Sequence, residues 1–138
     1  MVDDEIRVIF QEPLLSYADA DFLLKARRID ALETYLSERI DQLDGHLYYR
    51  LLPLAEALEG NGRPLVGSLI YRALLDSILT RAVSKYYHHG VRYLRKLDRL
   101  ATSVADWKNW PSHSVYLTAL HEQNKRKIAF WTKYQAGD

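Results

Sequence analysis

Residues 63–101 read RPLVGSLIYRALLDSILTRAVSKYYHHGVRYLRKLDRLA, and this stretch decides the fold. It predicts two helices joined by a short connection, the first from Pro64 to about Thr80 and the second from about Lys85 to Ala101. Proline suits a first helical turn because an N–H there has no intrahelical acceptor. Since the first helix has only a narrow polar stripe, we expect its neighbours to cover it on several sides at the centre of the core.

The second helix of this pair divides into an apolar seam and a basic side. Gly90 in its middle costs stability relative to alanine, which predicts the close approach of a neighbouring helix. The basic side, called the basic stripe below, is expected to face water. Its cations are Lys85, Arg92, Arg95, Lys96 and Arg99.

On the N-terminal side, residues 1–15 are expected to form an arm with a short β-like patch around Ile6 to Phe10. Apolar residues at helical spacing then predict one long helix over 19–43, or two helices with a break near Asp30. A further helix is predicted over 46–59, which Pro53 should kink or split.

On the C-terminal side, a loop is predicted from Thr102 to Trp110, followed by a helix that starts at Pro111 and a last short amphipathic helix. The sequence thus predicts an all-α fold of five to seven helices. We expect a single helical domain over 16–134 and a tail at 135–138.

Composition and charge are those of a globular protein with an uneven charge distribution. Apolar residues make up 48% and charged residues 27% of the chain. Residues 1–60 contain 13 Asp and Glu against 6 Lys and Arg, whereas residues 61–138 contain 13 Lys and Arg against 5 Asp and Glu. The acidic half could attract the basic half, or the basic half could draw in anionic partners.

The sequence lacks the residues and motifs that several kinds of site require. The chain has no cysteine, and its acidic start does not resemble a secretory signal. No apolar run reaches the roughly 20 residues that span a bilayer, so we expect a cytoplasmic protein without membrane contact. The glycine loop of nucleotide-binding sites, the Gly-x-Ser-x-Gly hydrolase motif and the zinc-protease helix are all missing. We therefore predict a non-enzymatic protein without metal or cofactor.

Three segments resemble a known bacterial family of uncharacterised helical proteins. They are RPL…LIYRALLDSIL, KYYHHGVRYLRKLDRLA and a C-terminal pattern of His113, Tyr116, Leu120, Arg126, Lys127, Phe130 and Trp131. The resemblance covers about residues 22–132, with Asn124 at a position where members often have histidine. It implies antiparallel helical hairpins of the tetratricopeptide-like kind, and it implies no known activity.

Two functional hypotheses remain open at this stage. The first is a protein-interaction module or scaffold, because stacks of helical hairpins present extended grooves. Its predicted surface combines the basic stripe with Arg72 and Asp76 on the central helix, and a second edge is formed by His113, Arg126 and Lys127. The second is a nucleic-acid-binding accessory protein that uses the basic helix 85–99. A protein partner, nucleic acid and a homo-oligomer are all compatible with these residues.

Overall fold

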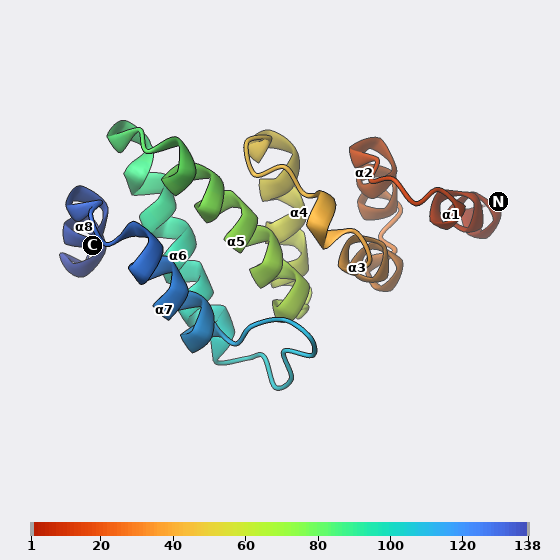
Figure 1. Cartoon of the computed structure of the whole chain (residues 1–138). Helices are drawn as coiled ribbons and strands as arrows, with labels where there is room; N and C mark the ends of the chain where they lie inside the picture. The colour runs from red at the N-terminus through yellow and green to blue at the C-terminus, as the bar shows by residue number, and fades with distance from the viewer. Residues whose placement is uncertain (1, 138) are drawn as a thin grey trace.

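The computed structural model describes residues 2–137, and over that range the protein is all-helical, with eight α-helices and no strand (Figure 1). The helices are α1 (Val2–Gln11), α2 (Tyr17–Lys25), α3 (Ile29–Ser37), α4 (Tyr48–Gly60), α5 (Pro64–Arg81), α6 (Tyr87–Ala101), α7 (His113–Asn124) and α8 (Ile128–Gln135). Two short 3-10 turns, η1 (Ile40–Gln42) and η2 (Ser84–Tyr86), join them. The all-α class is confirmed, with one helix more than the predicted maximum.

The helices follow one another across the molecule, with α1 and α8 at opposite ends (Figure 1). α5 lies between α4 and α6 and packs against both along its length. Leu69, Leu74 and Ile78 are 4%, 1% and 6% exposed. The prediction that the segment starting at Pro64 is covered by its neighbours is therefore confirmed.

The hairpin of α5 and α6 is closed by a short left-handed turn. Ala82 ends α5 with a φ of 54°, and its N–H donates to the Ile78 carbonyl. Gly90 of α6 meets α8, since a Cβ built there would lie 3.1 Å from the Phe130 ring and 3.3 Å from the Ile78 side chain. The predicted close approach at Gly90 is confirmed.

The N-terminal region differs from the predicted arm. Ile6 to Phe10 belong to helix α1, so the expected β-like patch is wrong. Ile6, Ile9 and Phe10 pack on the core, and these positions share one helical face. The stretch 19–43 contains two helices, as the second alternative predicted, but they break at Arg27, where φ is 59°, and the second ends at Ser37 instead of reaching residue 43. Residues 1 and 138, the outermost positions of the predicted arm and tail, lie outside the described range.

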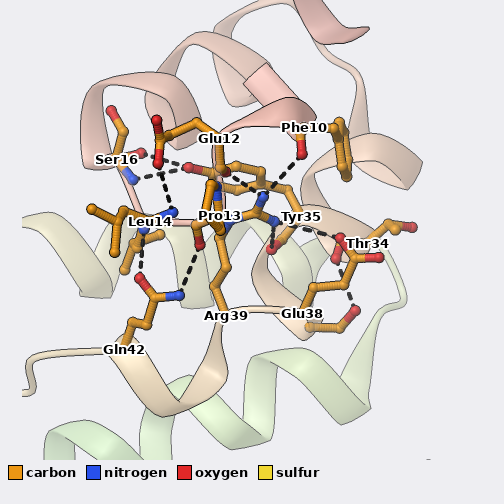
Figure 2. Close-up of polar contacts among 12 residues, drawn as sticks. Phe10, Glu12, Pro13, Leu14, Ser16, Thr34, Tyr35, Glu38, Arg39 and Gln42 are labelled. Carbon is orange, nitrogen blue, oxygen red and sulfur yellow. Dashed lines mark hydrogen bonds and ion pairs between the residues drawn. The ribbon is translucent and has the colours of Figure 1, made fainter. Parts of the chain in front are cut away.

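A buried arginine joins α1 to α3 (Figure 2). Arg39 is 4% exposed, and its Nη2 donates to the Glu12 carbonyl at 2.8 Å while its Nη1 donates to the Tyr35 carbonyl at 2.9 Å. Its guanidinium lies 4.0 Å from the Tyr35 ring centroid. Backbone carbonyls and an aromatic face thus hold this charge, with the Glu38 carboxylate 3.5 Å from Nη1.

The later boundaries shift by a few residues from the prediction. α4 runs unbroken through Pro53, so the proline does not split it. α7 starts at His113, not at Pro111, because the Ser112 hydroxyl caps it by accepting from the Val115 N–H. Within the described residues, no helix is long and apolar enough to cross a bilayer.

Candidate functional site

A cleft of about 610 Å³ lies between α4, α5 and α6, where the 45–46 loop meets the start of α6. Its floor is apolar and consists of Leu52, Leu74 and Ile78. Its walls carry cations, imidazoles and tyrosines. These wall residues are His46, Tyr48, Arg81, Tyr86, His89, Arg92 and Tyr93.

Helical spacing explains why these side chains meet. Leu74, Ile78 and Arg81 follow one another at intervals of four and three on α5, so they project from one face. On α6, Arg92 and Tyr93 lie three and four residues after His89, so each is a helical neighbour of His89. Gly45 closes one end against the α5 backbone, where a Cβ would lie 2.0 Å from the Ala73 carbonyl oxygen. The loop therefore reaches α5 only because residue 45 has no side chain.

The charge in the cleft is positive and uncompensated. No Asp or Glu lines it. Arg92 is exposed, and no ion pair or hydrogen bond of its guanidinium is seen within residues 2–137. Arg81 donates from Nε to the Ser77 carbonyl at 3.3 Å and lies 5.7 Å from the Tyr86 ring centroid. Both arginines are thus available to an anion entering from solvent.

The charge of Arg92 acts on two titrating groups of the cleft, Tyr93 and His89. Burial raises the pKa of the Tyr93 hydroxyl, the charge of Arg92 lowers it, that of Glu56 raises it, and that of Arg81 lowers it to a smaller extent. Burial lowers the pKa of His89, and the neighbouring His88 and Arg92 lower it further. Tyr93 is therefore a protonated hydrogen-bond donor at neutral pH, and both guanidinium groups lie near enough to act on it.

The five cations of the basic stripe have separate roles in the structure. Lys96 pairs with Glu59 of α4 at 3.1 Å and lies 5.8 Å from the Tyr71 ring centroid. Arg95 donates to carbonyls at the end of α8, including that of Gly137 at 2.6 Å. Lys85, Arg92 and Arg99 are exposed. The stripe therefore keeps three of its cations open to solvent, of which Arg92 belongs to the cleft.

Arg72 corrects the predicted surface. It is only 5% exposed, and its guanidinium lies between two rings, 4.6 Å from the Trp107 centroid and 4.5 Å from the Tyr116 centroid. The interpretation of Arg72 and Asp76 as an exposed polar edge is therefore wrong for Arg72. Asp76 remains exposed and accepts a hydrogen bond from the Tyr116 hydroxyl at 2.7 Å. Burial and the adjacent Asp76 charge raise the Tyr116 pKa far above its ordinary value.

His113 has a structural partner on α6. Its Nε2 lies 2.7 Å from Asp98 Oδ1, and the Tyr134 hydroxyl donates to the other carboxylate oxygen at 2.5 Å. One acid thus joins α6, α7 and α8. Arg126 is exposed, whereas Lys127 Nζ donates to the Asn124 side chain at 2.8 Å. His113 and Lys127 therefore hold neighbouring elements, and only Arg126 of the predicted second edge is fully open.

Sequence reasoning missed most of the cleft. Arg92 was predicted as a binding residue, but His46, Tyr48 and Arg81 were not, because they come from a loop and two other helices. The cations and tyrosines of residues 85–93 could have predicted the α6 wall of the cleft, but not the other walls. Within the described part of the chain, no group of three or more His, Cys, Asp or Glu side chains could hold a metal ion.

Comparison with known proteins places the chain in a family. The sequence model of the family of unknown function DUF6880 matches residues 11–133. The chain belongs to this family. No curated protein and no solved structure matches it. The match begins where α1 ends, and it includes the cleft as well as the Arg72, His113 and Tyr116 contacts.

Proposed function

We propose that this DUF6880 chain is a non-enzymatic protein-interaction module whose α4–α6 cleft binds an acidic segment of a partner polypeptide. The observation that carries the proposal is the lining of the cleft, with two arginines and two histidines and no carboxylate. An acidic side chain entering it would meet donors without displacing an existing ion pair. Fewer competing contacts favour net binding.

The cleft can contact the apolar parts of a peptide as well as its negative charge. Tyr48 and Tyr86 are 58% and 39% exposed, and Leu52 and Leu74 form an apolar floor beneath them. Tyrosine and arginine are the side chains most often found as energetic anchors of protein interfaces. The cleft thus offers apolar contact for a partner's backbone and side chains beside a fixed positive charge.

We also propose a bacterial cytoplasmic location. For the scaffold we propose a tetratricopeptide-like arrangement of the helices, which a repeated turn supports. The α2–α3 and α4–α5 turns end in the same pattern, in which a left-handed residue precedes an arginine whose N–H bonds back five residues: Arg28 to Leu23 at 3.0 Å and Arg63 to Leu58 at 2.8 Å. Arg28 and Arg63 are 35 residues apart, a period typical of helical repeats.

A second candidate function is nucleic-acid binding. The observation that favours it is the exposure of Lys85, Arg92 and Arg99 along one helix, with Tyr86 available for stacking on a base. Binding to phosphates would weaken steeply with added salt, because counterions are released on association. Binding of a peptide in a partly apolar cleft would respond much less.

A peptide-display selection tests the proposal. We expect selection on the full chain to enrich short segments that combine acidic with aromatic or aliphatic residues. Arg92→Glu should abolish this enrichment, whereas Arg99→Glu should leave it intact. Arg99 is a matched control because it lies about two helical turns from Arg92, is also exposed, and does not line the cleft. Absence of acidic segments, or equal loss with both variants, would refute the proposal.

A fluorescence titration with single-stranded oligonucleotides decides the second candidate. An oligonucleotide affinity that falls with added salt and is lost in the double variant Arg92→Glu, Lys96→Glu would support nucleic-acid binding. An affinity that this double variant leaves unchanged would exclude the basic helix as the interface.

A further inference from the structure

We infer that the cationic end of the cleft, formed by Arg81, Arg92, His46 and His89, binds a phosphorylated side chain of the partner segment. This inference rests on the proposed function and names its ligand more narrowly. The acidic group recognised is a dianionic phosphoryl group and not a carboxylate. The reasons are the number of uncompensated charges, the geometry of the donors and the place of the nearest acids.

The charge count favours a dianion. Arg81 and Arg92 contribute two permanent positive charges, since guanidinium stays protonated throughout the physiological range. No carboxylate lines the cleft to offset either one. A partner carboxylate would neutralise one of these charges, whereas a phosphoryl group carries about −1.5 to −2 at neutral pH and matches both.

The donors around this end are of the kind that phosphate uses. Each guanidinium presents a planar fork of N–H groups that matches two phosphate oxygens. The two arginines come from different helices, α5 and α6, and both line the same cleft as Tyr93. The imidazoles of His46 and His89 supply further donors from the loop and from α6.

The nearest acids do not fill this position. Glu56 on α4 lies one turn beyond Leu52 and raises the pKa of Tyr93 through its charge, but it forms no ion pair among the described residues and does not line the cleft. Asp44 and Asp76 lie in the neighbouring hollow, which Arg81 also lines, but neither acid forms an ion pair with Arg81 among the described residues, and Asp44 accepts a hydrogen bond from the backbone N–H of His46 at 3.0 Å. The cationic end of the cleft therefore has no internal substitute for an incoming dianion.

The test uses one peptide from the display selection, synthesised with serine, aspartate or phosphoserine at its central acidic position. Binding of each form to the full chain is measured by fluorescence anisotropy at neutral pH. We expect the phosphoserine form to bind at least about tenfold more tightly than the aspartate form, since each added charged hydrogen bond supports a change of that size. Serine should bind most weakly.

Variants assign the preference to the cleft. Arg92→Gln should remove the phosphoserine preference, Arg92→Lys should keep part of it because the charge stays while the fork is lost, and Arg99→Gln should change nothing. Circular dichroism confirms that each variant is folded. Arg92 and Arg99 are both exposed, so neither substitution is expected to disturb the core.

The outcomes separate this inference from the proposed function. Equal binding of the aspartate and phosphoserine forms, lost in Arg92→Gln, would overturn the phosphoryl inference and keep the peptide-binding cleft. No binding of any form would overturn the proposed function. In a parallel NMR titration, phenyl phosphate that binds with Arg92 dependence while all peptides fail would indicate a small phosphate ligand and overturn the phosphopeptide inference.

Discussion

Both sides of the α5–α6 hairpin carry arginine and aromatic side chains, but these are buried on one side and accessible on the other. On the α7 side, Arg72 lies between Trp107 and Tyr116 and is 5% exposed. On the α4 side, Arg81 lies 5.7 Å from the Tyr86 ring centroid and Arg92 is exposed, and neither has an acidic partner among residues 2–137. We call these the sealed side and the open side. Arginine beside an aromatic ring is a structural element where other helices cover it and a candidate binding element where they do not.

The difference follows from what covers each side. The 102–112 loop and α7 cross the sealed side, so Trp107 and Tyr116 close over Arg72 and Asp98 joins three helices. On the open side α4 begins at Tyr48, and a cleft of about 610 Å³ remains between α4, α5 and α6. Function is therefore expected where the packing stops, and stability where it continues.

The largest expected contrast comes from truncating one arginine on each side. Arg72→Ala should lower the free energy of unfolding by about 2–3 kcal/mol, because it removes the stem and the charge that two rings enclose. Arg92→Ala should change it by less than about 0.5 kcal/mol, as expected for an exposed site. Denaturant unfolding monitored by circular dichroism measures both. Equal effects would end the distinction between the two sides.

Arg72→Met refines this contrast. Arg72 Nε and Nη2 are buried and have no hydrogen-bond partner, so the guanidinium carries a desolvation cost that a thioether would not. We expect methionine to fill the same slot and to lose less than about 1 kcal/mol. A loss as large as that of alanine would show that the charge, and not the packing, holds the two rings.

A middle-sized effect is expected at Asp98. Asp98→Ala leaves His113 and the Tyr134 hydroxyl without their shared acceptor and should cost about 2 kcal/mol. The loss should appear first as faster amide hydrogen exchange in α7 and α8. Glu122→Ala is the control, because its pair with Lys125 is exposed and spans one helical turn, so it should cost less than about 0.5 kcal/mol.

The sequence could predict the open side only in part. Helical periodicity located α5 and α6 and separated the apolar seam from the basic stripe, which is local information. It could not show that Lys96 meets Glu59 of α4 or that Arg95 meets the end of α8, because those contacts join residues 37 or more positions apart. The sequence therefore predicted five exposed cations in the basic stripe, whereas only Lys85, Arg92 and Arg99 are exposed.

The sealed side was predicted less well, for a physical reason. Arg72 and Asp76 are four residues apart, which is the spacing of a surface ion pair, and nothing local signals that a tryptophan from the 102–112 loop will cover one of them. His113 and Tyr116 stood out in the family resemblance, but their partners lie on α6 and α5. Conspicuous residues can thus mark packing as readily as binding.

The smallest effect is a pH dependence that belongs to the sealed side. Burial, together with the hydrogen bond to Asp98, raises the pKa of Tyr134 from its ordinary value of 10.0 to about 12. Folded Tyr134 therefore keeps its proton between pH values of about 10 and 12, whereas the unfolded chain releases it, so stability falls as pH rises through that window and is unaffected at neutral pH. In Tyr134→Phe the free energy of unfolding should fall less steeply with pH, with a slope that differs by up to the contribution of one bound proton. Tyr49→Phe, which changes an exposed tyrosine of α4, is the control, and an equal change of slope in both variants would contradict the assignment.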